Sequence, residues 1–220
     1  MDGSIQICFI RVIRVPSFAS ITAEYFPKYL QLSRNISDLV EENYRKMKYS
    51  IERSIEILGR TPAVMNSLLS GIDDDWVMNN EGPETFSPYD VIGHLLHGEK
   101  TDWTARTKRI LEFGDTKTFD VYDRFARNEE SKGKTLQQLL DEFAVLRKEN
   151  ITWFKSRELT EADLDKKGMH PGLGSVTLRN LLATWVVHDL THIAQVTRVM
   201  AKQYKEEMGP WTDFFRILSF

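Results

Sequence analysis

From Met47 to the C-terminus, the sequence predicts an all-α protein, an up-down type four-helix bundle. Four long stretches carry apolar residues at three- and four-residue intervals, which is the period of an amphipathic helix. Turn residues separate these stretches, and β-branched residues never alternate cleanly between turns, so no strands are expected there. Without an internal repeat to suggest a solenoid, helices of this kind bury their apolar faces against one another as a bundle.

The first predicted helix is kinked. After its first three apolar positions, Gly59 and Thr61-Pro62 interrupt it, and Thr61 can cap a restarted helix that has Pro62 in its first position. The apolar residues of the two parts are Ile51, Ile55, Leu58, Met65, Leu68 and Leu69.

The second predicted helix begins at Ser87-Pro88. The serine can cap the helix, proline suits its first turn, and Asp90 stands at the capping-box position. We expect this helix to run to Phe113 and to stop at Gly114.

The third helix opens with Thr135 and Gln138, which have the spacing of a capping box. Its apolar residues are Leu136, Leu139, Leu140, Phe143, Leu146, Ile151 and Phe154. After the glycine-rich segment MHPGLGSVT, which we expect to be a loop, Thr177 caps the fourth helix, and this helix ends before Gly209. One side of the fourth helix carries Leu178, Leu181, Leu182, Trp185, His188, His192 and Val199.

Composition and charge exclude several classes of protein. The chain has 220 residues, of which 41% are hydrophobic, enough for one well-buried core. The net charge of −3 comes from interspersed charges, so nucleic acid is not an expected partner. A single cysteine, Cys8, excludes an internal disulfide and a thiolate zinc cluster within the chain, and it suggests a reducing cytoplasm. No run reaches the roughly 18 apolar residues of a membrane span.

Residues 1–46 are interpreted as an N-terminal extension, and residues 47–220 as the helical domain. The extension shows no sustained apolar period, whereas helical patterning begins directly after Met47. One hypothesis is therefore that Met47 is the natural start. A signal peptide is disfavoured because Asp2, Arg11 and Arg14 interrupt the required pattern.

The string HDLTH in the fourth helix places His188 and His192 four residues apart, on one helix face. Trp185 shares that face, so both imidazoles point inward, where a metal ion would satisfy their nitrogens. Such a pair also arises by chance, and spacing alone is moderate support. Bundle metal sites take further ligands from a second helix, and the second predicted helix offers His94 and His97. Periodicity does not distinguish between these two.

The two histidine segments resemble a known family. The strings VIGHLLHGEKTDW and LLATWVVHDLTHIAQ are similar to two marker regions of the DinB-like superfamily of bacterial four-helix metalloproteins. The resemblance runs from about Met47 to the end of the chain. It implies a three-histidine metal site in the bundle core, with one ligand from the second helix, which matches His94, and two from the fourth, which match His188 and His192.

Three neutral imidazoles leave a coordination position open, which is typical of a catalytic ion. Imidazole suits several metals, and we expect zinc first and nickel next. Relatives in this superfamily include thiol-dependent transferases and the mycothiol-dependent maleylpyruvate isomerase. The resemblance therefore implies a transferase or isomerase that acts on a small-molecule substrate with a low-molecular-weight thiol, the metal activating a thiolate or water. Cys8 lies outside the resemblance, so the sulfur would arrive with the cosubstrate.

Several polar side chains could support this site. Gln195 could hydrogen-bond a ligand or simply face solvent, and Asp189 could orient a ligand or be a surface carboxylate. Glu99 and Asp102 could accept a proton, although salt bridges on the helix surface explain them as well. We expect His97 to be an interior or rim histidine that the metal does not need.

Other residues have simpler interpretations. His170, in the glycine-rich segment, could overhang the site or be solvated. We expect Trp103, Trp153, Trp185 and Trp211 to supply core and interface bulk. The apolar C-terminal string WTDFFRILSF is expected to pack across the bundle or to form a contact between subunits, which makes a homodimer one expectation.

Two other functions stay open. HDLTH has the histidine spacing of HExxH zincins, but Asp189 stands where that mechanism needs glutamate, so a metal-dependent hydrolase is the lesser alternative. The same residues also fit a non-catalytic, metal-stabilised bundle that acts as a binding module. The identity of the substrate does not follow from the sequence, because pocket loops decide it.

Overall fold

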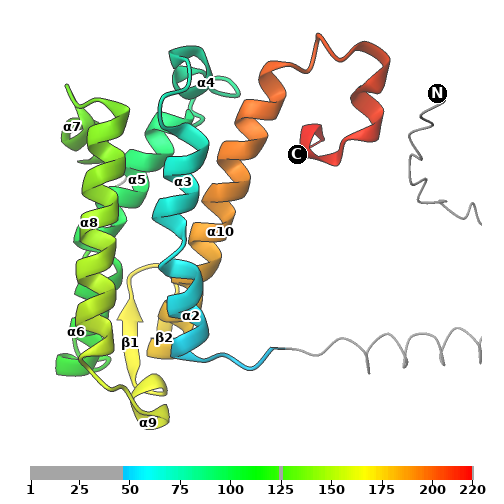
Figure 1. Ribbon diagram of the computed structural model, residues 1–220. Coiled ribbons are helices and arrows are strands. Elements are labelled where there is room, and N and C mark those ends of the chain that lie inside the picture. The colour runs from blue at the N-terminus through cyan, green and yellow to red at the C-terminus, as the bar shows by residue number, and fades with distance from the viewer. Residues whose placement is uncertain (1–46, 124–125, 220) are drawn as a thin grey trace, which may run out of the picture. The chain divides into compact units, whose positions relative to one another are not determined.

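Four helical columns lie side by side in the computed structural model, which describes residues 47–123 and 126–219 (Figure 1). The first column joins α2 and α3, the second joins α5 and α6, and α8 and α10 are the third and fourth. The predicted four-helix bundle is confirmed. Residues 1–46, with Cys8, lie outside the described residues, so the extension and the start at Met47 stay predictions.

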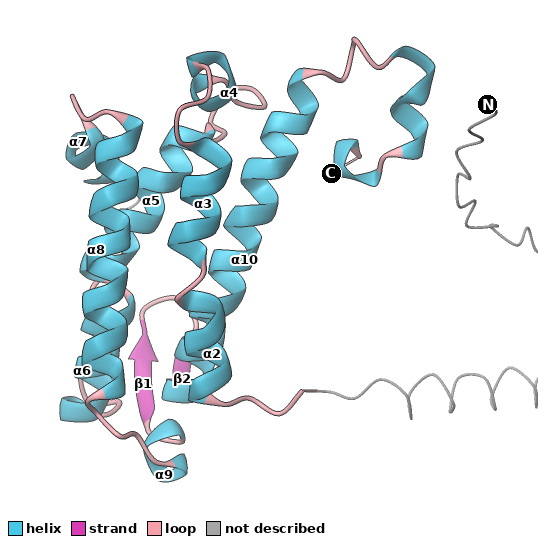
Figure 2. Cartoon of the chain, viewed as in Figure 1, coloured by secondary structure: helices cyan, strands magenta, loops and turns pink. Residues whose placement is uncertain are grey.

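Helices make up most of the fold, and one short hairpin lies at one end of the columns (Figure 2). The α-helices are α2 (Ile51–Leu58), α3 (Thr61–Leu69), α4 (Asp74–Met78), α5 (Pro88–Thr101), α6 (Trp103–Phe113), α7 (Ala126–Ser131), α8 (Leu136–Lys155), α9 (Glu161–Leu164) and α10 (Leu178–Gln203). The strands are β1 (Lys167–His170) and β2 (Gly174–Thr177), and two 3₁₀ helices, η1 (Gly209–Phe214) and η2 (Arg216–Leu218), follow α10.

The first column is interrupted where the sequence predicts a kink. Ser50 caps α2 by accepting a hydrogen bond from the Arg53 amide at 3.2 Å, and α2 ends before Gly59. The sequence predicts Thr61 as the cap of α3, but Arg60 holds that position. Thr61 is already helical, and its hydroxyl donates to the Ile57 carbonyl at 3.3 Å, so its side chain links the two helices across the break.

The second column begins with the predicted capping box of Ser87 and Asp90. The column ends at Phe113, before Gly114, as predicted, but it is divided in two: Asp102 (φ −108°, ψ −75°) stands between the end of α5 at Thr101 and the start of α6 at Trp103. The break turns the indole of Trp103 towards the preceding turn. A Cβ at Gly98 would lie 3.3 Å from Trp103 Nε1, so glycine leaves the room that the indole needs.

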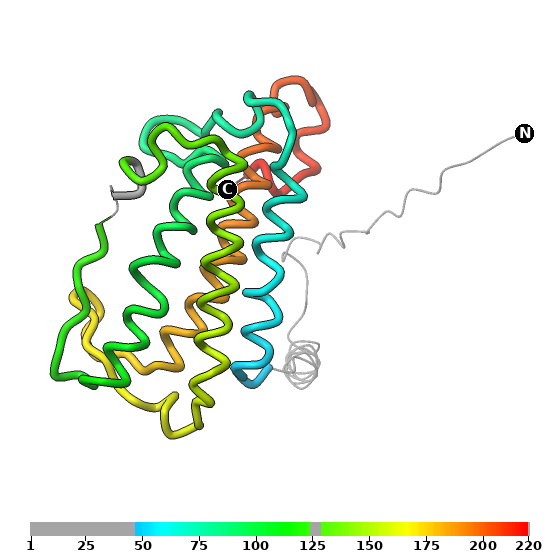
Figure 3. The backbone as a smooth tube through the Cα atoms, turned by 60° about the vertical axis from the view of Figure 1, so that its left-hand side comes forward, coloured from blue at the N-terminus to red at the C-terminus, as the bar shows by residue number. Residues whose placement is uncertain are grey.

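The second and third columns run in the same direction. Near the start of both, Tyr89 Oη donates to the Lys134 carbonyl at 2.8 Å, and further along both, Asn150 Nδ2 donates to the Glu99 carbonyl at 2.9 Å. Parallel neighbouring helices require a long crossover connection, and residues 114–135 provide it. Simple up-down alternation therefore does not describe this pair of helices (Figure 3).

The segment expected to be a loop before the fourth column is an antiparallel hairpin. β1 and β2 pair from Lys167 with Thr177 to His170 with Gly174. A three-residue turn at 171–173 precedes Gly174, whose φ of +74° suits glycine, a common hairpin geometry. Strands of four residues are too short to show a clear alternation, which is why the sequence pattern did not predict them.

The capping box of Thr177 and Asn180 starts α10 directly after the hairpin. This connection sets the register at which α10 enters the bundle. Beyond α10, Leu218 of η2 is buried, whereas Trp211, Phe214 and Phe215 are exposed by half or more. Trp211 is thus not core bulk, and a homodimer through this segment stays a prediction.

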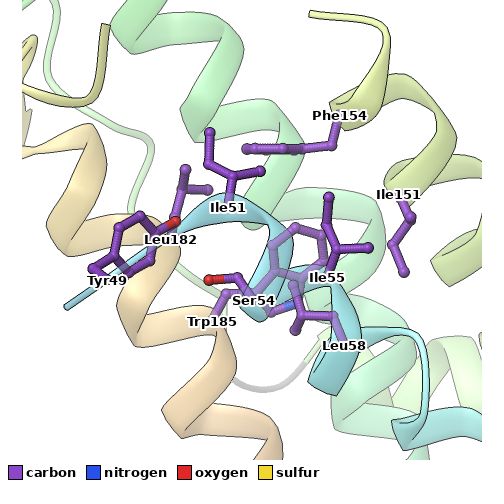
Figure 4. A pocket seen from close by; sticks show the side chains of 9 residues that line it. All are labelled: Tyr49, Ile51, Ser54, Ile55, Leu58, Ile151, Phe154, Leu182 and Trp185. Atoms are coloured by element: carbon purple, nitrogen blue, oxygen red, sulfur yellow. The ribbon is translucent and has the colours of Figure 1, made fainter. Parts of the chain in front are cut away.

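Two apolar clusters form the core. One joins α3, α5 and α8, and its buried residues include Met65, Ile92 and Phe143. The other surrounds Trp103 and Trp185 between α6 and α10. A small cavity of about 10 Å³ beside Trp185 has room for one water molecule and none for a substrate (Figure 4).

Among the described residues, no helix is long and apolar enough to cross a membrane.

Candidate metal centre

Three histidines from two helices converge between the second and fourth columns. His94 of α5 and His188 of α10 bring their Nε2 atoms to 2.9 Å, and the Nε2 atoms of His188 and His192 are 3.2 Å apart. Candidate ligand atoms of all three lie within 4.8 Å of one another. Zinc with bonds of 2.0–2.1 Å to nitrogen holds tetrahedral ligands about 3.3 Å apart. The spacing therefore fits one small cation with modest adjustment.

Two of these histidines have a hydrogen-bond partner on the opposite nitrogen. Tyr122 Oη lies 3.0 Å from His94 Nδ1, and Gln195 Oε1 lies 2.8 Å from His192 Nδ1. When Nε2 carries a metal, Nδ1–H donates to such an acceptor and fixes the ring. This pattern of inward Nε2 and outward Nδ1 atoms is the arrangement of metal-bound imidazoles, and it gives the predicted Gln195 a direct contact with a candidate ligand.

His188 differs from the other two. Its Nδ1 is buried and makes no hydrogen bond with any described residue, and Asp189 Oδ1 stands 4.0 Å away. That separation exceeds the range of a hydrogen bond, which ends near 3.2 Å. The ring is held instead by packing, with the Trp103 ring edge-on at 5.0 Å between centroids.

Burial suppresses protonation of His192. Desolvation, followed by the charge of neighbouring His188, lowers the pKa of His192 to about 4. A neutral imidazole is the form that binds a metal, so His192 is ready to do so throughout the neutral range.

Aromatic rings enclose the three histidines. Phe86 meets His94 edge-on at 5.7 Å between centroids, and Tyr122 does so at 5.9 Å. On the α10 side, Trp103 stacks on Trp185 at 5.7 Å with an angle of only 9° between the rings.

A buried ionic cluster lies directly behind His188. Arg147 of α8 donates from Nη2 to Glu99 Oε1 at 2.7 Å and to Asp189 Oδ1 at 3.0 Å, and from Nη1 to Asp189 Oδ2. Asn150 and Trp185 each donate to the Glu99 carboxylate, at 2.9 and 3.2 Å. Burial would raise the pKa of Asp189, but its interactions with His188 and Arg147 outweigh burial and lower it. Burial would lower the pKa of Arg147, but the carboxylates of Glu99 and Asp189 outweigh it and raise that pKa. Arg147 and Asp189 therefore carry opposite charges at neutral pH.

The cluster changes the interpretation of two predicted residues. Asp189 is not a surface carboxylate, since its side chain is 0% exposed. Glu99 does form a salt bridge, but inside the bundle rather than on a solvated helix face. Asp189 follows His188 directly in α10, and Glu99 is linked to Asp189 through Arg147.

The remaining candidates lie outside the histidine group. His97 is buried, and its Nδ1 pairs with Glu130 at 2.9 Å. Asp102 pairs with Arg106, and burial raises the pKa of its carboxyl. His170, at the end of β1, accepts amide hydrogen bonds within its own hairpin, and burial, followed by the charge of Arg106, lowers its pKa.

Sequence reasoning missed Tyr122 and Arg147. Tyr122 lies in the long connection, where no period marks it. Arg147 stands beside Lys148 in a helix rich in charge, and nothing in that pattern separates a buried arginine from a solvated one. The signal would have been the burial of Glu99 and Asp189, because two buried carboxylates on neighbouring helices need a cation between them.

The comparisons with known proteins agree with this geometry. A family model of the DinB superfamily matches residues 57–196. A solved structure, YfiT from Bacillus subtilis, is similar with a TM-score of 0.58 and 20% identity over 72% of this chain and 91% of that one. It is described as a probable metal-dependent hydrolase with an unusual four-helix bundle topology, and at this identity the likeness shows the fold alone. None of the curated proteins matches the chain.

Proposed function

The chain belongs to the DinB superfamily, and on that premise we propose that it is a metal-dependent enzyme whose ion is held by His94, His188 and His192. The observation that carries the proposal is the convergence of three imidazole Nε2 atoms. Because two of the opposite nitrogens already face acceptors, the donor set fits a metal with little rearrangement. Three protein ligands leave a position for a reactant.

The choice of ion follows from the ligands. Three neutral imidazoles without a thiolate or carboxylate suit zinc and also nickel, and we favour zinc with nickel next. When bound, such an ion supplies Lewis acidity and lowers the pKa of a thiol or water in the open position.

The reaction class we propose is transfer or isomerisation with a low-molecular-weight thiol. No cysteine lies in the described residues, so the sulfur nucleophile would belong to the cosubstrate. The chain's own residues have defined parts in this scheme. The three histidines position the ion, Tyr122 and Gln195 orient two of them, and Trp103 excludes water from the side of His188.

Hydrolysis is a second candidate, which the description of YfiT favours. It would use the same three histidines and the same open position, with water in place of the thiol. A non-catalytic bundle stabilised by its metal is the third. The surrounding rings and hydrogen bonds are compatible with all three.

Turnover by zinc-loaded protein distinguishes these functions. The protein is assayed with several low-molecular-weight thiols and electrophilic acceptors and with activated esters, and His188→Ala is the matched control. We expect thiol transfer that disappears in His188→Ala and after chelation. Ester hydrolysis without thiol transfer would favour the second function. A large loss of thermal stability on chelation, with no turnover of any substrate, would favour the third.

A further inference from the structure

The cluster behind His188 has unbalanced charge. Glu99 and Asp189 each carry −1 and Arg147 carries +1, so their formal sum is −1. The three side chains are 0–1% exposed, so water screens this excess poorly. An uncompensated buried charge is costly, and a nearby cation reduces that cost.

The excess charge lies next to His188, whose Nδ1 makes no hydrogen bond within the part of the chain that the structure describes. His94 and His192 have Tyr122 and Gln195 on their outer nitrogens, while His188 Nδ1 has Asp189 Oδ1 at 4.0 Å. Closing this gap to hydrogen-bond range requires roughly 0.8 Å of movement.

We propose that Asp189, fixed by Arg147 and Glu99, is the positioning residue of His188 and supplies the negative charge that the metal centre lacks. The inference rests on the proposed function, because it assumes an ion on Nε2 of the three histidines. Ligand imidazoles commonly donate their second N–H to a carboxylate, which orients the ring and makes it more basic. Three neutral ligands give a divalent ion no charge compensation, and this cluster provides part of it.

Arg147 gives the carboxylate a fixed position. Its two Nη atoms bond both oxygens of Asp189, and Nη2 also bonds Glu99, so the guanidinium ties α10 to α5 through α8. Phe143 and Trp185 lie under the guanidinium, with its carbon 4.9 and 5.1 Å from their centroids. Asp189 therefore keeps its place beside His188, and the 4.0 Å gap has to close by movement of the imidazole.

The test compares zinc affinity in full-length wild type, Asp189→Asn and Glu81→Gln, measured by competition with a chromophoric chelator. Asp189→Asn keeps the shape of the side chain and removes its charge. Glu81 is the matched control, a carboxylate that pairs with Arg198 at 2.8 Å and with Lys202 at 2.8 Å and touches none of the three histidines. We expect about 10–100-fold weaker binding for Asp189→Asn and wild-type binding for Glu81→Gln.

A second readout needs no variant. In the imidazole ¹H–¹⁵N spectrum of zinc-loaded wild type, we expect His188 to carry its proton on Nδ1, shifted downfield by a hydrogen bond to a carboxylate. Unchanged affinity in folded Asp189→Asn, or a His188 whose Nδ1 carries no proton, would overturn the inference while leaving the proposed function intact. A wild-type protein that binds no zinc would overturn both.

Discussion

Acidification should destabilise the metal-free protein through His192. Its imidazole has a pKa of about 4 in the folded protein, against an ordinary value of 6.5. The unfolded chain therefore takes up this proton near pH 6.5, whereas the folded protein resists it until about pH 4. The contribution to stability is complete above pH 6.5 and is lost progressively as the pH falls towards 4.

The magnitude follows from the two pKa values. Their difference of 2.5 (6.5 − 4) corresponds to about 3 kcal/mol at full extent. Between pH 7 and pH 5 the loss is about 2 kcal/mol, since most of the unfolded chains, but few of the folded ones, are protonated at pH 5.

Urea unfolding of chelator-treated protein at pH 7 and pH 5 measures this loss. Other groups titrate in the same interval, so the comparison is with His192→Gln, whose side chain stays neutral. We expect the free energy of unfolding of wild type to fall by about 2 kcal/mol more than that of the variant. Parallel losses in the two proteins would show that His192 is not held neutral by its surroundings, and the account of the centre's burial would be wrong.

Three further predictions concern the scaffold. Gly168→Ala should lower the free energy of unfolding by about 1–3 kcal/mol, because an added Cβ would lie 2.6 Å from Ile110 Cγ1. Gly172→Ala is the control, since its added Cβ would meet nothing closer than 3.9 Å and should carry no such steric penalty. Urea unfolding compares the two variants. Arg147→Met should cost about 3–5 kcal/mol, since it strands two buried carboxylates, and a calorimetric melting temperature equal to that of wild type would contradict this. Thr177→Ala should cost about 1 kcal/mol through loss of the α10 cap, to be measured by thermal melting followed by circular dichroism.

The sequence predicted those features that depend on residues close together in the chain, namely helix caps and the pair of histidines on one face of α10. The capping boxes expected at Ser87 and Thr135 form, and so does the cap expected at Thr177, because each depends on residues three apart. The i,i+4 spacing of His188 and His192 likewise places both rings on one face. Among the described residues, these elements needed no knowledge of the tertiary fold.

The remaining features of the fold and of the site depend on contacts between helices. The choice of His94 over His97 depended on family resemblance, and in the structure it depends on which face of α5 meets α10. The direction of α8 relative to α5 is set by the return connection, which carries no periodic signal. Arg147 has the same local pattern whether its partners are water molecules or the carboxylates of two neighbouring helices, so its burial could not be deduced from α8 alone.

Metal stoichiometry tests the central claim most directly. Elemental analysis of purified wild type should find one divalent ion per chain, retained in His97→Ala and lost in His94→Ala, His188→Ala and His192→Ala, with circular dichroism confirming that each protein is folded. Loss of one of three ligands should weaken binding more than the 10–100-fold typical of a group that only orients a ligand. Full metal in folded His94→Ala together with its loss from His97→Ala would show that the ligand from α5 is misassigned. Full metal in all four variants would contradict the three-histidine centre itself.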